Sequence, residues 1–203
     1  RKSQIFAIPG GFSLGDEPDG SAKFLANILR NEKISSAIDD LLNENDGLVI
    51  GICNGFQALV KTGLLPYGKV TSPQEDDPNL TFNTNRRHIA TFVDTLCLTN
   101  NSPWTNGIDM DKTYRMPISH GEGRFVIKED KLQELLDNEQ VFSAYKISPN
   151  GSDYNIEGIL SRDGKILGRM CHTERIADDL YKNIYDIDKQ NIFRNAVEYF
   201  KEK

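Results

Sequence analysis

The stretch Leu48-Val49-Ile50-Gly51-Ile52-Cys53-Asn54-Gly55-Phe56-Gln57 decides the fold of this chain. Its first five residues form an uninterrupted apolar run, which is typical of a parallel strand that is buried on both faces. The apolar pattern continues through residues 58–60 and predicts a helix that begins near Gly55. A buried strand that turns directly into a helix predicts an α/β domain.

Cys53 lies in the turn between this strand and this helix. Gly51 and Gly55, two residues before and two after it, permit the tight, strained turn that lifts a nucleophile out of the sheet in serine hydrolases. The thiol is then expected over a helix N-terminus, whose N–H groups favour the thiolate. A buried, inert cysteine in a glycine-rich turn is the alternative. Cys53 follows the carboxyl end of a strand, where open α/β sheets place their ligands, and this position favours its interpretation as a nucleophile.

Segments on both sides of this turn continue the alternation of strands and helices. Residues 5–8 predict a strand in the middle of a sheet, cut from a longer polypeptide. Two helical patterns follow, the first capped by Ser21; they carry Phe24, Leu25, Ile28 and Leu29, and then Ile34, Ile38, Leu41 and Leu42. Further predictions are a loop at 71–83, a strand at 92–98, a hairpin of 155–160 with 165–170, and an amphipathic helix at 188–200. We expect one three-layer α/β domain over residues 1–203, with a mostly parallel central sheet, flanking helices and additional antiparallel hairpins.

Composition excludes several classes of protein. The 203 residues carry a net charge of −6, and their 24 lysines and arginines are spread thinly, which argues against nucleic acid and anionic membranes as partners. No apolar run approaches the roughly 18 residues of a membrane-spanning helix and no leader is evident, so we expect a cytoplasmic protein. The three cysteines, Cys53, Cys97 and Cys171, lack the pattern of a disulfide framework or a zinc site, and we expect no metal.

A thiol nucleophile needs a base, and the base needs a partner that orients it. His172-Thr173-Glu174 follows the apolar run 166–170, and in an extended segment residues i and i+2 point the same way, so Glu174 can bind one imidazole nitrogen. His120-Gly121-Glu122 has the same spacing, and spacing alone does not choose between the two. His88 has no carboxylate at comparable spacing and is expected to be a surface or strand residue.

A site for negative charge is predicted after the first strand. Pro9-Gly10-Gly11-Phe12-Ser13 offers backbone N–H groups that side chains do not shield, and the N–H of Asn54 points to the same place. Together these groups can form an oxyanion hole. The segment lacks the pattern of a P-loop or a dinucleotide fingerprint, so no nucleotide site is predicted here.

The segment around Cys53 resembles the nucleophile motif of the class I (triad) glutamine amidotransferases. Further segments narrow the resemblance to the glutaminase domain of phosphoribosylformylglycinamidine synthase; these are Gly10-Gly11-Phe12-Ser13-Leu14-Gly15-Asp16, Ser119-His120-Gly121-Glu122-Gly123-Arg124, Pro149-Asn150-Gly151-Ser152 and His172-Thr173-Glu174-Arg175. They occur in the family's order and span residues 9–175. The family also has a strand and a helix before the Gly-Gly loop, so the resemblance implies that this chain is a fragment lacking both.

The resemblance implies a role for each matching residue. Cys53 is the nucleophile, His172 the base and Glu174 its orienting carboxylate. The oxyanion N–H groups come from Gly11, Phe12 and Asn54, and the contacts to the amino acid part of glutamine from Gln57, Ser119, His120 and Gly121.

The implied reaction is hydrolysis of glutamine to glutamate and ammonia through a cysteinyl thioester. Ammonia passes through a channel to a separate ATP-dependent synthetase region, which makes formylglycinamidine ribonucleotide in purine biosynthesis. No cofactor is expected in this domain, and Mg-ATP is expected on the synthetase. The alternatives are another cysteine hydrolase, such as a γ-glutamyl hydrolase, or a non-catalytic docking module.

Two segments depart from the family. Cys171 and Thr173 stand where the family has prolines, in Pro-His-Pro-Glu-Arg, which bears on how rigidly His172 is held. On this resemblance, Cys171→Pro is expected to be tolerated. Residues 83–90 match the family's Asn-rich segment only loosely, and no contact is assigned to them.

Overall fold

The computed structural model describes residues 3–11, 22–177, 180–185, 187 and 189–201. Within them, seven strands form one sheet in the order β1-β2-β9-β8-β7-β4-β5, and β3 and β6 form a second, two-stranded sheet. The strands are β1 (Ile5–Ile8), β2 (Leu48–Ile52), β3 (Asn79–Phe82), β4 (Ile89–Cys97), β5 (Thr113–His120), β6 (Glu122–Val126), β7 (Val141–Tyr145), β8 (Ile156–Leu160) and β9 (Ile166–Arg169).

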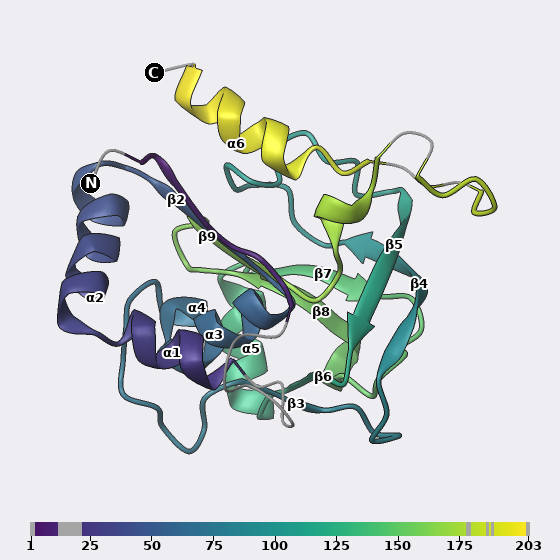
Figure 1. Cartoon of the computed structure of the whole chain (residues 1–203), viewed down its shortest axis with the longest axis horizontal. Coiled ribbons are helices and arrows are strands. Elements are labelled where there is room, and N and C mark those ends of the chain that lie inside the picture. The colour runs from purple at the N-terminus through teal and green to yellow at the C-terminus, as the bar shows by residue number, and fades with distance from the viewer. Residues whose placement is uncertain (1–2, 12–21, 178–179, 186, 188, 202–203) are drawn as a thin grey trace.

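The helices flank the parallel part of the large sheet. They are α1 (Lys23–Leu29), α2 (Glu32–Asp39), α3 (Asn54–Thr62), α4 (Leu64–Tyr67), α5 (Glu129–Asp137) and α6 (Ile192–Lys201), with a π-helical turn η1 (Asp40–Glu44) and two 3-10 turns, η2 (Asp153–Asn155) and η3 (Thr173–Arg175). In Figure 1, α1, α3 and α4 lie on one side of β1, β2 and β9, and α6 lies on the other. This arrangement places β2 between layers of helices.

The parallel part of the sheet is the part that the sequence predicts best. β2 pairs in parallel with β1 on one side and with β9 on the other, and all five of its residues are buried. β8, β7, β4 and β5 then follow with antiparallel pairings, so β1, β2, β9, β7 and β5 point one way and β8 and β4 the other. The predicted fold class, α/β with a mostly parallel central sheet and antiparallel hairpins, is confirmed.

Several local predictions are also confirmed. β8 and β9 form the predicted antiparallel hairpin, and β4 covers the strand predicted at residues 92–98. The helices predicted before and after β2 are present as α1, α2 and α3. Cys97 is 2% exposed and belongs to the core.

Other local predictions are wrong or fall outside the described residues. Within the described residues β1 lies at an edge of the sheet, and the expected further strand beside it stays a prediction. The predicted loop 71–83 contains β3, because pairing with the distant strand β6 makes Asn79–Phe82 extended. The final helix begins at Ile192, later than predicted. Ser21, the predicted helix cap, lies outside the described residues.

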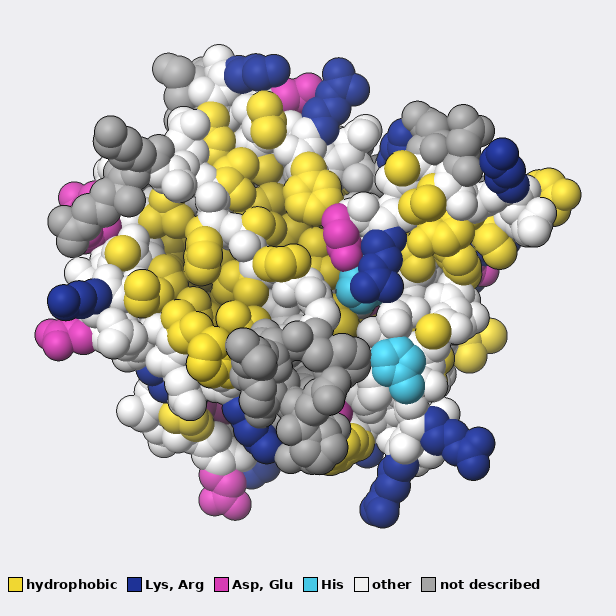
Figure 2. Space-filling model, in the orientation of Figure 1, with side chains coloured by type: hydrophobic (Ala, Val, Ile, Leu, Met, Phe, Trp, Pro, Cys, Tyr) yellow, Lys and Arg dark blue, Asp and Glu magenta, His cyan; other side chains and the backbone are white. Residues whose placement is uncertain are grey.

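An apolar groove of about 470 Å³ runs beside β1, between that strand and the helices α1 and α2. Its apolar lining includes Phe6, Ile8, Leu25, Ile28, Ile34 and Ile38. Two residues predicted on buried helix faces, Ile28 and Ile34, are 39% and 38% exposed there, because no other described element covers them. Figure 2 shows the resulting broad apolar area on this face of the molecule.

Candidate active site

Cys53 occupies a strained turn between β2 and α3. Its backbone has φ 52° and ψ −106°, a conformation that is unfavourable for a residue with a side chain. Gly55 lets the turn pack on the first strand, since a Cβ there would lie 2.1 Å from the carbonyl oxygen of Ile8. A Cβ on Gly51 would lie 2.6 Å from Leu59 Cδ1. The two glycines therefore permit the tight turn that the sequence predicts.

His172 reaches the same place from the neighbouring strand. The N–H of Cys53 donates to the carbonyl of Arg169, the last residue of β9, at 2.8 Å, and His172 follows three residues later. A Cβ built on Gly10 would lie 2.8 Å from His172 Cε1 and 3.0 Å from Cys53 Cβ. The loop after β1, the thiol and the imidazole therefore meet at the carboxyl ends of three adjacent parallel strands.

Glu174 holds the imidazole of His172. Glu174 Oε1 lies 2.5 Å from His172 Nδ1, which places the proton on Nδ1 and leaves the lone pair on Nε2. His172 is 1% exposed, and its Nε2 has no hydrogen-bond partner among the described residues. The contact between Glu174 and His172 is the predicted one, but it forms for a different reason. The prediction assumed an extended segment, in which residues i and i+2 point the same way, whereas His172 precedes the 3-10 turn η3.

His120 lies close by but is held differently. Its Nδ1 lies 3.1 Å from Asn83 Oδ1, and a Cβ on Gly123 would lie 2.4 Å from the imidazole. Burial, with the nearby charges of His88 and His172, lowers the pKa of His120 to about 4, so the ring is neutral near pH 7. The structure thus pairs His172, and not His120, with a carboxylate at Nδ1. His88 is exposed, as predicted, and its Nε2 lies 2.9 Å from Ser119 Oγ.

Burial dominates the electrostatics of the thiol. It raises the pKa of Cys53 to about 11, although hydrogen bonds from the N–H groups of Asn54 and Gly11 and the charge of Arg175 act in the opposite direction. The N–H groups therefore favour the thiolate, as expected from the helix N-terminus, but desolvation outweighs them. The thiol is neutral at rest.

Glu174 is ionised. Its partial burial raises its pKa, but the hydrogen bond from His172 and the charges of His172 and Arg175 outweigh that effect and leave the pKa below its usual value. Arg175 Nε lies 3.7 Å from Glu174 Oε1. An ionised carboxylate on Nδ1 stabilises the imidazolium that forms when Nε2 takes a proton.

Two of the three predicted oxyanion groups surround the thiol. The N–H groups of Gly11 and Asn54 both interact with the sulfur of Cys53. Gly11 has φ 115°, a conformation that favours glycine, and a Cβ there would meet no atom within 4 Å. Phe12 lies outside the described residues.

The predicted glutamine contacts form the other wall of the site. Cys53 Sγ lies 3.7 Å from the carbonyl oxygen of Ser119, at the end of β5. Gln57, on α3, donates from Nε2 to the carbonyl oxygen of Glu122, one residue after Gly121. In the part of the chain that the structure describes, Gln57 Oε1 and His120 Nε2 are buried and have no hydrogen-bond partner.

Three residues that the sequence does not single out support this site. Asn83 is 1% exposed and binds both the ring of His120 and, through Nδ2, the carbonyl oxygen of His120 at 2.9 Å. Glu157 and Arg169 form a buried ion pair next to the loop that carries His172. In the sequence, Glu157 and Arg169 stand out only as the single charged residue in each of the two apolar strands of the predicted hairpin.

The ion pair also bears on a predicted substitution. Glu157 Oε1 accepts a hydrogen bond from the N–H of Cys171 at 2.6 Å. Proline has no N–H, so Cys171→Pro would leave this buried carboxylate without one donor. The structure therefore predicts that Cys171→Pro lowers stability, against the expectation from the resemblance.

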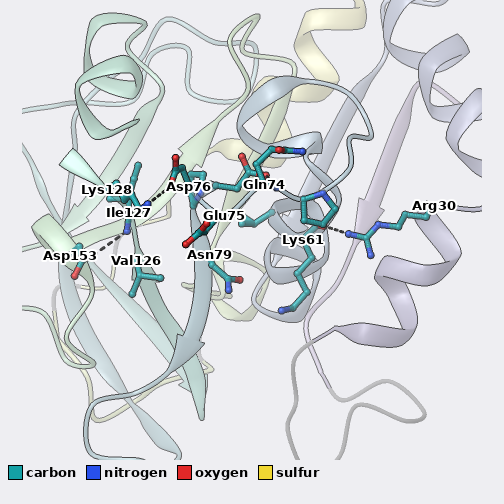
Figure 3. Close-up of a pocket in the computed structure, with 14 residues that line it drawn as sticks. Arg30, Lys61, Gln74, Glu75, Asp76, Asn79, Val126, Ile127, Lys128 and Asp153 are labelled. Carbon is teal, nitrogen blue, oxygen red and sulfur yellow. Dashed lines mark hydrogen bonds and ion pairs between the residues drawn. The ribbon is translucent and has the colours of Figure 1, made fainter. Parts of the chain in front are cut away.

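A separate pocket of about 630 Å³ contains none of the predicted site residues. Figure 3 shows Arg30 and Lys61 on one side, Lys128 and Asp153 on the other, and residues 74–79 between them. Charges of both signs line it, and Lys128 pairs with Asp76. The predicted catalytic residues Cys53, His172 and Glu174 therefore lie outside this pocket.

The described residues contain neither a cluster of metal ligands nor a membrane-spanning helix. Among residues 3–11, 22–177 and the described residues beyond them, no group of three or more His, Cys, Asp or Glu side chains is placed to hold a metal ion. None of the helices in the described part of the chain is long and apolar enough to cross a membrane.

A triad glutamine amidotransferase has a cysteine thiol, an imidazole and an orienting carboxylate at the carboxyl ends of parallel strands. Cys53 after β2, and His172 and Glu174 after β9, have this arrangement. The comparisons agree. A model of the CobB/CobQ-like glutamine amidotransferase domain matches residues 1–200. The chain belongs to this family, and within it to the subunits named PurQ of phosphoribosylformylglycinamidine synthase.

Individual relatives support this placement. The PurQ subunit from Prochlorococcus marinus (strain MIT 9312) is 37% identical over 172 residues, which cover 85% of this chain and 70% of the relative. The PurQ subunit from Methanococcus maripaludis (strain C7) is 34% identical, with 97% of this chain and 80% of the relative covered. The structure of PurLQS from Thermotoga maritima matches at 31% identity with a TM-score of 0.75, over 97% of this chain and 80% of that one.

Proposed function

We propose that this chain hydrolyses glutamine through a thioester on Cys53. The sulfur attacks the carboxamide carbon of glutamine while the thiol proton moves to His172 Nε2. That proton then passes to the leaving nitrogen, which departs as ammonia. A water molecule, deprotonated by His172 Nε2, attacks the thioester carbon, the C–S bond breaks to release glutamate, and the proton on His172 returns to the sulfur of Cys53. The observation that carries this proposal is the strained Cys53 beside an imidazole whose Nδ1 is held by Glu174 and whose Nε2 has no partner within the described part of the chain.

The N–H groups of Gly11 and Asn54 stabilise the charge that develops during attack. They already interact with the sulfur, so the oxygen of a tetrahedral intermediate on that sulfur lies within their reach. Removing one donor from an oxyanion hole costs roughly 100- to 1000-fold in rate. Backbone donors suit this task because they are fixed before the reaction begins.

Gln57 and the segment Ser119–Gly121 bind the amino acid part of glutamine in this proposal. Support comes from their position against the thiol and from the buried polar atoms Gln57 Oε1 and His120 Nε2, which lack partners in the described structure. A buried polar group without a partner is costly, and a polar substrate that binds there removes that cost. A γ-glutamyl hydrolase is less well supported, because the chain belongs to the PurQ subunits.

The chain supplies ammonia for the synthesis of formylglycinamidine ribonucleotide in purine biosynthesis and works in a complex with a synthetase partner. We propose that the partner binds Mg-ATP, receives the ammonia through a channel, and contacts this chain near η3 and the turn between β5 and β6. The side chain of Arg175 is 44% exposed beside Glu174, where a partner can reach it. Arg124 lies on β6, two residues after its start, and donates to the carbonyl oxygen of Gly151 at 3.0 Å.

Cys53→Ala tests the proposed chemistry. In the complete enzyme, we expect loss of glutamine-dependent synthesis and survival of synthesis from free ammonia, because only thioester formation needs the thiol. A covalent adduct of diazo-oxo-norleucine, detected by mass spectrometry, should form on unmodified Cys53 and be absent from the variant. Cys97→Ala is the control, since Cys97 packs in the core. Parallel loss of both activities in a folded Cys53→Ala enzyme would contradict the assigned role.

A further inference from the structure

Two oppositely charged side chains are buried next to the loop that carries His172. Arg169 ends β9, Glu157 lies on the neighbouring strand β8, and both side chains are 0% exposed. Arg169 Nε donates to Glu157 Oε1 at 3.1 Å, and Arg169 Nη2 donates to Glu157 Oε2 at 2.9 Å. Two parallel contacts fix the guanidinium against the carboxylate more strictly than one contact does.

Stability alone is a weak reason for such a pair. Removal of two charges from water costs free energy that their attraction often only offsets, and apolar residues of similar volume are frequently as stabilising. Within the described residues, Glu157 also accepts from Ser143 Oγ, and Arg169 Cζ lies 5.2 Å from the centroid of the Phe142 ring. The pair also makes contacts outside β8 and β9, with the segment around His172, and these contacts indicate its role.

The pair holds the residue on each side of His172. Glu157 Oε1 accepts from the N–H of Cys171 at 2.6 Å, and Arg169 Nη1 donates to Thr173 Oγ1 at 2.9 Å. Both contacts are buried. The backbone just before the histidine and the side chain just after it are therefore tied to one rigid group.

His172 depends on its flanking residues for orientation. Its N–H donates to the carbonyl oxygen of Pro117 at 2.9 Å, and its ring is held at Nδ1 by Glu174. Glu174 is itself carried by the short turn η3 and its side chain is 33% exposed, so its position follows from the backbone that leads into η3. A displacement of about 1 Å in a catalytic geometry can lose roughly 100-fold in rate.

We propose that Arg169 and Glu157 are positioning residues that restrain the backbone on both sides of His172 and so hold its imidazole against Cys53. Neither Cys171 nor Thr173 has a ring that fixes φ, and hydrogen bonds from the buried pair restrain this segment instead. This inference rests on the proposed function, because it assigns a role only if His172 is the base.

Thr173→Val tests the inference without unpairing a charge. Valine keeps the shape of the buried threonine and removes the oxygen that accepts from Arg169, while the contacts between Arg169 and Glu157 remain. In the complex with the synthetase partner, we expect kcat for glutamine hydrolysis to fall roughly 10-fold or more with KM unchanged. Thr173→Ser restores the oxygen and should recover most of the wild-type kcat.

Gln190→Leu is the matched control. Gln190 accepts a hydrogen bond from the same Arg169 nitrogen, Nη1, and its own Nε2 donates to Cys97 Sγ at 3.2 Å, on β4. Its removal should lower the thermal midpoint about as much as Thr173→Val and leave kcat unchanged. Equal losses of kcat in the two variants, or an unchanged kcat in Thr173→Val, would overturn the positioning role.

The outcomes also separate this inference from the proposed function. If Cys53→Ala hydrolyses glutamine as fast as the unmodified enzyme, the proposed function fails and the positioning role fails with it. If hydrolysis depends on Cys53 but Thr173→Val keeps full kcat, only the positioning role fails.

Discussion

The thiol of Cys53 is held as a neutral group, because burial raises its pKa to about 11. A neutral thiol is a weak nucleophile, so in the proposed mechanism its proton passes to His172 as the sulfur attacks glutamine. The rate then depends on the orientation of one imidazole more than on a standing population of thiolate. That dependence makes each contact to His172 a point at which the reaction can be tested.

The two His-x-Glu pairs give different predictions. His172→Ala should slow thioester formation roughly 100- to 10,000-fold, the usual contribution of general base catalysis, because His120, the other buried imidazole of the site, contacts Asn83 at Nδ1 and not a carboxylate. His120→Ala should mainly raise the KM for glutamine. Single-turnover rates and steady-state kinetics in the complete enzyme separate the two effects, and the reverse pattern would assign the base to His120.

The lowered pKa of His120 predicts how the free energy of unfolding depends on pH. Its pKa is about 4 in the folded chain and about 6.5 when unfolded, so the unfolded state binds more protons between these values. Stability from the neutral ring is fully present above pH 6.5 and is lost as the pH falls through 4, by at most about 3 kcal/mol. Urea unfolding at several pH values should show this loss, and His120→Gln should flatten it. An equal slope in both proteins would contradict the prediction.

At the scale of elements, the turn between β2 and α3 depends on close packing against β1. Gly55→Ala would place a Cβ 2.1 Å from the carbonyl oxygen of Ile8, and backbone atoms cannot move away without disturbing the sheet. We expect a loss of about 3 kcal/mol in the free energy of unfolding, at the upper end of the usual cost of overpacking.

Gly121→Ala is the control for this prediction. A Cβ at Gly121 would meet no atom within 4 Å, so stability should change little even if glutamine binding weakens. Urea unfolding of both variants gives the comparison. A Gly55→Ala chain as stable as Gly121→Ala would show that β1 does not constrain the turn.

For the whole molecule, we expect the rate of glutamine hydrolysis to depend on the synthetase partner. The candidate site is assembled from loops that follow β1, β2, β5 and β9, and β1 has no second neighbour among the described strands, so a small shift of these loops would misplace the proposed triad. The isolated chain should hydrolyse glutamine slowly or not at all, and addition of the partner with its nucleotide substrates should accelerate it. The measurement is glutamate release with and without the partner. If the isolated chain hydrolyses glutamine as fast as the chain with its partner, the rate does not depend on the partner.

The sequence determined the elements that carry the chemistry, because their signals are local. The apolar run before Cys53 and the glycines around it predicted β2, the strained turn and α3, since buried strands and tight turns impose composition on consecutive residues. Asp163-Gly164 likewise predicted the hairpin of β8 and β9. The fold class follows from these local patterns.

Only the tertiary structure decided which side chains meet. Two histidines have the same spacing to a glutamate, and the contact of His120 with Asn83, 37 residues away in the sequence, is what separates them. β3 was missed because its strand partner is β6, and the pair of Glu157 with Arg169 was missed because each charge lies in an apolar run. The raised pKa of Cys53 was not visible in the sequence, because desolvation depends on all the surrounding atoms, whereas the helix N-terminus that opposes it is a local feature. Contacts between residues far apart in the chain leave no local pattern, so they are decided only when the chain folds.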